Sequence, residues 1–279
     1  MLAPRYKTVI DADKKGISIN LKELVKYKDL FLLLAYRDYR VRYAQTLIGF
    51  AWAFIQPLAT LLIFIVVFGK AIQVDTGNIP YPVFAVAGMI GWSYFSFVLN
   101  QAGGSIIGSQ EMVKKIYFPR LVIPLSKALV GLVDFTISFI ITVVFMIIYG
   151  IWPSVNIVFL PLFILIVIIS SLAVGIWLSA LSIRYRDFKH IIPFLVQFGL
   201  YATPVAYPSE LVVERLPEWA VILFYLNPMA GVIEGIRWSL FGLGSLTTYS
   251  YVSFGMIALL FVSALFYFKK MEKVMADYV

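Results

Sequence analysis

A stretch of 49 residues, 135–183, contains no charged side chain and limits what this chain can fold into. As one α-helix it would be about 74 Å long, whereas a membrane core about 30 Å thick is crossed by roughly 20 residues. The stretch therefore crosses a membrane twice, and residues 149–154, which include glycine and proline, have the composition of the connecting turn. We infer an integral membrane protein.

The overall composition agrees with this inference. Of the 279 residues, 61% are hydrophobic and 14% are charged; soluble domains average about 45–50% and about 25%. The sequence has no cysteine, a single histidine and no HExxH motif, so we expect no disulfide and no metal site.

Hydropathy predicts an all-α membrane protein with six transmembrane helices. The predicted spans are 47–68, 83–102, 123–149, 157–183, 191–207 and 249–268. A tail (1–19) and an amphipathic interfacial helix region (20–46) are expected before the six-span domain (47–279). Residues 208–244 contain a helix too short to cross, so we expect an external hairpin of short re-entrant helices there.

The basic residues predict the orientation of these spans. Segments on one side of the membrane hold 20 Lys and Arg residues and those on the other side hold three, and the richer side is normally cytoplasmic. Both termini are therefore expected in the cytoplasm. The formal net charge of +8 then reflects orientation and contact with anionic lipid, and we expect no nucleic-acid partner.

Charged residues near the first and third spans require partners or a role. Arg37, Arg40 and Arg42 are expected to form a basic collar at the interface, either as an anchor or also to steer an anionic head group. Asp134 is the one acidic residue inside a long span, so it should face protein or water and have a partner. On its own helix face, Lys127 lies two turns before it and Ser138 one turn after it.

Three segments resemble, in the expected order, the permeases of ABC type-2 polysaccharide exporters, of the kind that export lipid-linked O-antigen or wall teichoic acid. They are RDYRVRYAQTLIGFAWAFIQP (37–57), KKIYFPR with IPLS (114–126) and NPMAGVIEGIR (227–237). The resemblance covers about residues 20–275. It implies a homodimer in the bacterial inner membrane that binds a separate nucleotide-binding ATPase subunit and moves a lipid-linked glycan outward. ATP and Mg would then bind the partner, which agrees with the absence of a G-x-x-x-x-G-K-[ST] motif from this sequence.

The segment after the second span is expected to contact the ATPase. Its basic and aromatic side chains are common anchors of protein interfaces, with Tyr117 and Phe118 entering a cleft on the partner. Apart from the resemblance, a basic loop at the lipid head groups explains the same residues. The predicted coupling residues are Lys114, Lys115, Tyr117, Phe118, Pro119 and Arg120, with Arg184 and Arg186 as weaker candidates.

Aromatic faces predict a path for the glycan, because rings offer flat apolar surfaces to the C–H groups of sugars. The alternative is that these rings contact lipid or neighbouring helices. In the first span an aromatic face and an opposite face with Gln56 and Thr60 can each turn inward. The predicted path residues are Phe194, Gln197, Phe198 and Tyr201 in the fifth span, and Trp52 and Phe54 in the first.

The segment before the last span is the predicted external gate. Asn227 and Pro228 are typical of a helix start, and the helix is expected to run to Gly242 or Gly244. Glu234 and Arg237 lie three residues apart on this helix and are expected to pair.

Other functions fit the sequence less well. An ion-coupled secondary carrier usually has internal repeats and several ionisable residues in its spans, and a membrane-embedded transferase needs clustered acidic or histidine residues. Neither pattern is present. A type-2 permease for teichoic acid, drugs or small lipids remains an alternative.

Overall fold

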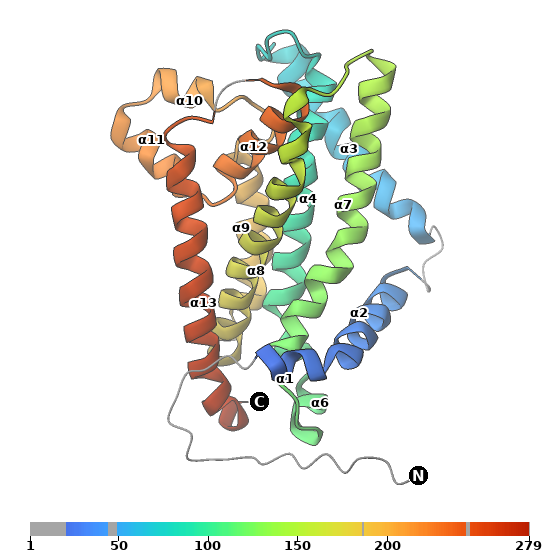
Figure 1. Ribbon diagram of the computed structural model, residues 1–279, viewed down its shortest axis with the longest axis vertical. Coiled ribbons are helices and arrows are strands. Elements are labelled where there is room, and N and C mark those ends of the chain that lie inside the picture. Colours follow the sequence, from blue (N-terminus) through green and yellow to red (C-terminus); the bar gives the residue numbers. More distant parts are fainter. Residues whose placement is uncertain (1–20, 44–48, 186, 244–245, 279) are drawn as a thin grey trace.

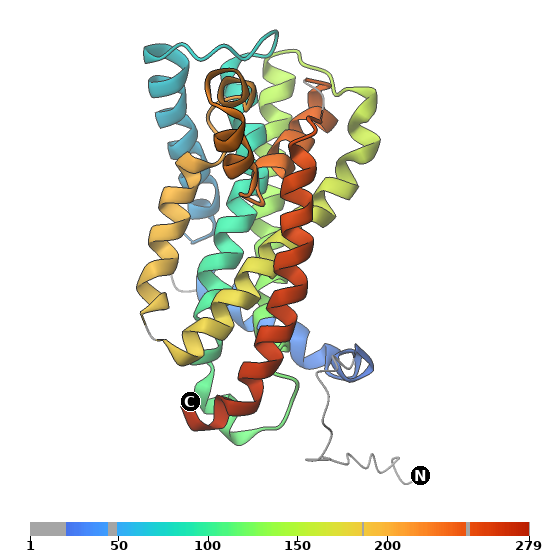
Figure 2. The same cartoon turned by 90° about the vertical axis from the view of Figure 1, so that its left-hand side faces the viewer.

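The computed structural model describes residues 21–43, 49–185, 187–243 and 246–278, and within these ranges the chain is helical and contains no strand (Figure 1). The predicted all-α fold is confirmed. The first described helix and the end of the last one lie at the same, lower end of the molecule in both views (Figures 1 and 2).

Two helices lie across this lower end before the first span. They are α1 (Leu21–Lys26) and α2 (Lys28–Tyr43), and α2 packs against α7 (Figure 1). Most of α2 is exposed, while Leu34 and Ala35 are buried. The apolar part of the contact between α2 and the bundle is therefore narrow.

Five helical segments of the described chain are long and apolar enough to cross a membrane. Their limits lie within a few residues of the predicted spans, although residues 47 and 48 fall outside the described part. The segments are Gly49–Ala71 (η1 Gly49–Ala51, α3 Trp52–Phe64 and η2 Ile65–Ala71), α4 (Tyr81–Gly103), α7 (Val122–Ile148), Val155–Arg184 (η3 Val155–Phe159 and α8 Leu160–Arg184) and Ser250–Lys273 of α13 (Ser250–Tyr278).

The fifth predicted span differs from the helix observed. The prediction covered residues 191–207, but α9 extends from Phe188 to Ala202 and is about 22 Å long at roughly 1.5 Å per residue. Thr203 is extended (φ −110°, ψ 144°) because the ring of Pro204 disfavours helical geometry in the preceding residue. This helix is therefore short for a full crossing.

Three short helices follow α9 and gather at the upper end of the molecule in both views: α10 (Glu210–Arg215), α11 (Glu218–Tyr225) and α12 (Ala230–Phe241) (Figures 1 and 2). Together α11 and α12 are long and apolar enough for one span, but they meet at 82°. Their place at one end agrees with the predicted external hairpin.

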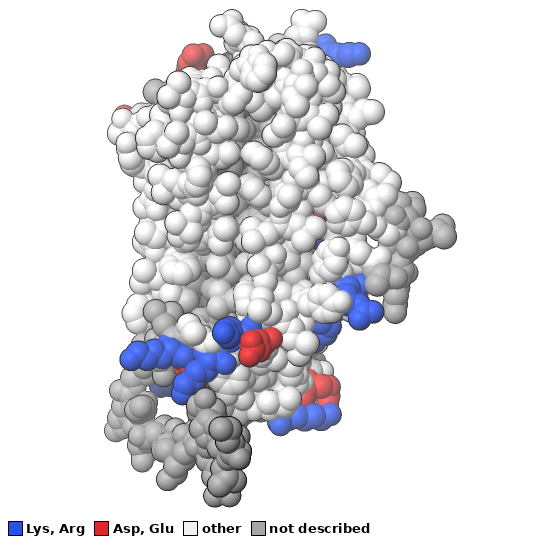
Figure 3. Space-filling model, turned by 45° about the vertical axis from the view of Figure 1, so that its right-hand side comes forward, with Lys and Arg blue, Asp and Glu red and all other residues white. Residues whose placement is uncertain are grey.

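The core forms around α4, with α7, α8, α9 and α12 packed against it. Two glycines allow this close packing: a Cβ on Gly131 of α7 would lie 2.9 Å from the Phe97 ring, and one on Gly175 of α8 would lie 3.1 Å from Ala102. On the face shown in Figure 3, charged side chains concentrate near the lower end and leave a broad uncharged band above. This is the surface of a membrane-spanning protein.

Candidate functional site

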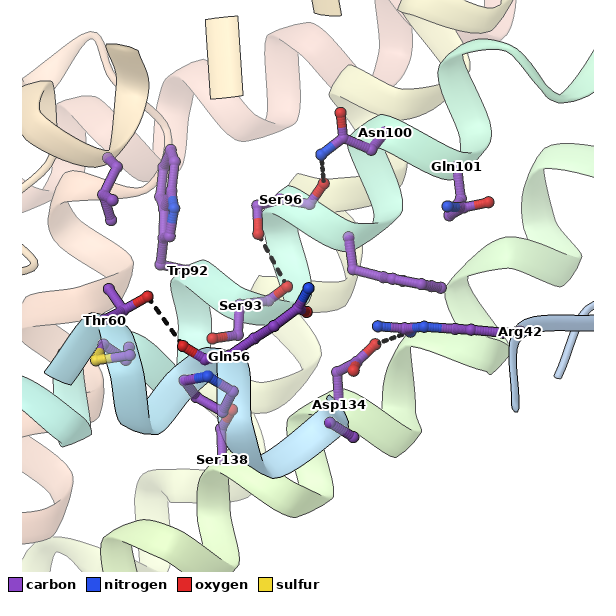
Figure 4. Close-up of a pocket in the computed structure, with 15 residues that line it drawn as sticks. Arg42, Gln56, Thr60, Trp92, Ser93, Ser96, Asn100, Gln101, Asp134 and Ser138 are labelled. Atoms are coloured by element: carbon purple, nitrogen blue, oxygen red, sulfur yellow. Dashed lines mark hydrogen bonds and ion pairs between the residues drawn. The ribbon is translucent and has the colours of Figure 1, made fainter. Parts of the chain in front are cut away.

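A pocket of about 340 Å³ opens among α2, α3, α4, α7 and α9 in the otherwise apolar bundle (Figure 4). Trp92 and Phe97 supply aromatic surface to its wall. Its lining carries hydroxyl and amide groups from Gln56, Thr60, Ser93, Ser96, Asn100, Gln101 and Ser138. The pocket can therefore exchange many hydrogen bonds with a hydroxyl-rich ligand while an aromatic face contacts its C–H groups.

The polar wall arises from one face of α4. Ser93, Ser96 and Asn100 recur at helical spacing, so their side chains point the same way. The Ser96 hydroxyl donates to the Ser93 carbonyl (3.1 Å), and the Asn100 amide donates to the Ser96 carbonyl (3.0 Å) (Figure 4). These bonds to the preceding turn lower the cost of polar side chains inside a span. The oxygen atoms of these side chains remain available as acceptors.

An ion pair between α2 and α7 lies at the pocket. Arg42 Nη1 is 2.5 Å from Asp134 Oδ2, and the Arg42 guanidinium lies 4.5 Å from the centre of the Phe97 ring (Figure 4). A second pair, Asp38 with Lys127, joins the same two helices. The partner of Asp134 is therefore Arg42, which no spacing within its own helix could indicate.

The predicted basic collar divides into an inner and an outer part. Arg42 turns inward to the pocket, whereas Arg37 pairs with Asp38 at 2.9 Å and stays half-exposed. Arg40 is exposed and lies 5.9 Å from the centre of the Tyr36 ring. Of the three predicted collar residues, Arg37 and Arg40 are therefore more exposed than Arg42.

The predicted path residues of the fifth span face away from the pocket. Phe194, Gln197, Phe198 and Tyr201 lie on the exposed side of α9, where the Phe194 and Phe198 rings stack with centres 6.2 Å apart.

In the first span, the face with Gln56 and Thr60 lines the pocket, and Trp52 lines a smaller cavity beside Arg42. Phe54, on the other face, packs against the core. The polar face is thus the one turned toward the pocket. Ser93, Ser96 and Asn100 were not predicted as path residues, although their spacing in an apolar span was a usable signal.

The predicted coupling segment begins with α6 (Gln110–Lys115) at the lower end (Figure 1). Lys114 and Lys115 are exposed, and Lys115 lies 3.3 Å from Glu111. Tyr117 is 54% exposed, and its hydroxyl donates to Glu23 at 3.5 Å. Burial, and then the nearby carboxylates of Glu23 and Glu272, raise the pKa of Tyr117 above its usual value of 10.0.

The rest of this segment is tied to the chain itself. Phe118 is 4% exposed and packs into the protein's own core, so of the two aromatic side chains only Tyr117 is available to a partner. Pro119 is partly buried, and Arg120 hydrogen bonds to Glu272 of α13. In the next loop Arg184 is exposed beside Tyr185, and Arg186 lies outside the described residues.

At the upper end, the predicted helix start is shifted by two residues. The Asn227 amide donates to the Thr203 hydroxyl (2.7 Å) and its oxygen accepts from the Met229 N–H (3.0 Å). The turn containing Pro228 is thereby fixed, and α12 begins at Ala230. It ends at Phe241, where Gly242 has the left-handed φ of 68° that ends many helices.

The predicted pairing of Glu234 with Arg237 is wrong: the two side chains bind different groups. Arg237 is 5% exposed and donates to the carbonyls of Pro204 (2.7 Å), Val205 (2.6 Å) and Phe84 (3.3 Å). Glu234 accepts from the Tyr225 hydroxyl and from Ser250 (2.6 Å). The break after α9 leaves carbonyls without helical donors, and Thr203-Pro204 in the sequence was a usable signal for that break.

Among the described residues, no three His, Asp or Glu side chains come close enough together to hold a metal ion. The side chains that line the pocket can form reversible hydrogen bonds and ion pairs.

Comparison with known proteins gives consistent matches. Residues 29–241 match the family described as ABC-2 type transporter. An O-antigen export system permease protein RfbA from Klebsiella pneumoniae is 31% identical over 239 residues, which cover 85% of this chain and 89% of the relative. One from Myxococcus xanthus is 28% identical over 217 residues (78% and 82%). The polysialic acid transport protein KpsM of Escherichia coli is 23% identical over 199 residues (71% and 76%).

Proposed function

The chain belongs to the ABC-2 type transporter family, and from this premise we propose that it is the permease of an exporter for an O-antigen-like, lipid-linked polysaccharide. The observation that carries the substrate class is the set of relatives. Three that are named O-antigen export permeases match between 78% and 85% of the chain. The role is transport, as it is for these permeases.

The pocket supports a polymer rich in hydroxyl groups. Its serine, threonine and amide side chains bind hydroxyls one at a time, and Trp92 and Phe97 offer ring faces. Each such contact is weak, and a polymer that must move through a site needs contacts that release it again. The polar face of the first span, with Gln56 and Thr60, and the polar face of α4 together form this side of the path.

The energy source in this proposal is a separate ATPase subunit that holds ATP and Mg. The sequence contains no phosphate-binding loop of its own. The docking surface is the lower end, where Lys114, Lys115, Tyr117 and Arg184 are exposed. In this proposal the protein lies in the bacterial inner membrane, and this end and both termini are cytoplasmic, as the charge distribution predicts.

A homodimer completes the path in this proposal. Phe194, Phe198 and Tyr201 form an exposed aromatic face on α9, with relative exposures of 65%, 64% and 58%. A second copy that covers this face would enclose Phe194, Phe198 and Tyr201 beside the path, which is the role that the sequence predicts for them.

Export from cells tests the proposal. A strain that makes lipid-linked O-antigen but lacks its own exporter receives this chain with its candidate ATPase, and antibody measures polysaccharide on intact cells. Ser96→Leu places a branched apolar side chain in the pocket, and we expect export to fall by about tenfold, corresponding to ~1.4 kcal/mol in the barrier.

The matched control is Ser263→Leu on α13. Both serines are partly buried and donate to the carbonyl three residues earlier, but Ser263 lies outside the pocket lining. We expect this variant to export normally. No surface polysaccharide from an assembled wild-type complex would contradict the substrate assignment. Surface delivery of teichoic acid in a second strain, one that makes teichoic acid but lacks its exporter, would then favour the alternative substrate.

A further inference from the structure

The coupling segment 114–120 is held by the far end of the chain. The Arg120 N–H donates to Glu272 Oε1 (3.1 Å), and Arg120 Nη1 donates to the Glu272 carbonyl (3.1 Å). The two residues are 152 positions apart in sequence. Both ribbon views show the end of α13 beside the segment that contains α6 (Figures 1 and 2).

The Glu272 carboxylate is itself held in a fixed orientation. Lys269, one turn earlier on α13, lies 2.7 Å from Oε2, which leaves Oε1 for the Arg120 N–H. The Glu272 side chain is 16% exposed. A carboxylate with both oxygens engaged and little access to water has few alternative orientations.

An apolar cluster joins the same two segments. Phe118 of the coupling segment belongs to one buried cluster with Phe268, Met271 and Met275 of α13. These three positions recur at helical spacing, so α13 presents one apolar face to the segment, and Glu272 lies next to it in sequence. The coupling segment and α13 therefore share an apolar contact in addition to the Arg120–Glu272 hydrogen bonds.

We propose that the C-terminal end of α13 positions the coupling segment for the ATPase, and that Glu272 is the positioning residue. This inference rests on the proposed function, which assigns the ATPase contact to Lys114, Lys115 and Tyr117. A push on these side chains then reaches α13 directly. Because α13 packs against α8, the push passes from the coupling segment into the helix bundle at the lower end.

Three variants of Glu272 separate positioning from a general need for charge. Glu272→Gln keeps the length of the side chain and an oxygen that can accept from the Arg120 N–H, but loses the charge. Glu272→Asp keeps the charge but is one methylene shorter and does not reach. Glu272→Ala loses both. Lys273→Ala, an exposed neighbour on the same helix, is the control.

The measurement is permease-stimulated ATP hydrolysis by the reconstituted complex, normalised to the ATPase that co-purifies. For Glu272→Ala we expect about a fivefold loss of stimulation, the effect of one hydrogen bond. Glu272→Gln and Lys273→Ala should keep wild-type stimulation, and Glu272→Asp should lose at least half of it.

Full stimulation by Glu272→Ala would overturn the inference. So would better stimulation by Glu272→Asp than by Glu272→Gln, because charge rather than reach would then matter. If the Glu272→Ala complex does not assemble, the comparison of Glu272→Asp with Glu272→Gln tests the inference instead. The readout does not require polysaccharide, so a wrong substrate assignment appears separately as wild-type stimulation without export.

Discussion

Two arginines near opposite ends of the molecule are held in different ways. Arg42, toward the lower end, faces the carboxylate of Asp134, and the two side chains are 29% and 13% exposed. Arg237, at the upper end, is 5% exposed and donates to backbone carbonyls, with its guanidinium 3.6 Å from the centre of the Phe84 ring. One arginine is held by a single charged group on another helix and the other by the backbone itself.

This difference indicates which end of the molecule can move. The Arg42–Asp134 pair joins two helices and borders a pocket of about 340 Å³, so the two charges have room to separate and each can find another partner. The carbonyls around Arg237 are parts of the chain after α9 and of α4, so they cannot leave without unfolding the turn. The upper end is therefore a fixed scaffold, and movement during transport should concentrate at the lower end.

Removal of the upper arginine should have the largest effect. Arg237→Met fills a similar volume but leaves several buried carbonyls without a donor, and each such group costs about 1–3 kcal/mol. We expect the free energy of unfolding in detergent micelles to fall by about 3–5 kcal/mol. The control is Arg215→Met at an exposed position of α10, which should be within about 0.5 kcal/mol of wild type. Equal stability of Arg237→Met and wild type would show that the upper end is not held by this residue.

Removal of the carboxylate at the lower end should have a smaller effect. Asp134→Ala leaves Arg42 unpaired, but Arg42 can turn toward water, so we expect a loss of about 2 kcal/mol in the free energy of unfolding. The exchanged pair, Arg42→Asp with Asp134→Arg, should regain most of this loss, because the attraction between the helices is restored. A loss that the exchange does not repair would mean that Asp134 acts through some other contact.

The sequence predicted well what depends on local pattern. The uncharged run 135–183 predicted two spans and their turn, and Gly242, one of the two glycines predicted to end α12, directly follows its last residue. The end of α9 was missed: the predicted span ran through Pro204 to residue 207, although a proline restricts the residue before it and the helix ends at Ala202.

What the sequence could not give was contacts between distant segments. Asp134 required a partner, but its nearest basic residue in sequence on the same face was Lys127, and the observed partner lies 92 positions earlier. Phe118 could equally have been an exposed anchor, because it is buried in a cluster that includes residues of α13 more than 140 positions later in the sequence. The polar face of α4 was readable from spacing, but its role depended on which helices surround it.

The smallest expected effect comes from the loss of a hydrogen-bond donor to Glu234, another charged residue at the upper end. The Tyr225 hydroxyl donates to Glu234 and accepts from Thr247, so Tyr225→Phe removes two bonds. Ser250 still bonds to both Glu234 and Thr247, and we expect a loss of about 1 kcal/mol in the free energy of unfolding. Tyr251→Phe, at a 65% exposed position of α13, is the matched control and should have no measurable effect. If the upper end is one fixed scaffold, the losses of free energy from Tyr225→Phe and Arg237→Met should not add in the double variant. Either substitution alone would then already weaken the contacts that the other removes. Strictly additive losses would show instead that Glu234 and Arg237 hold separate parts of the hairpin, and the contrast with the lower end would then apply to Arg237 alone.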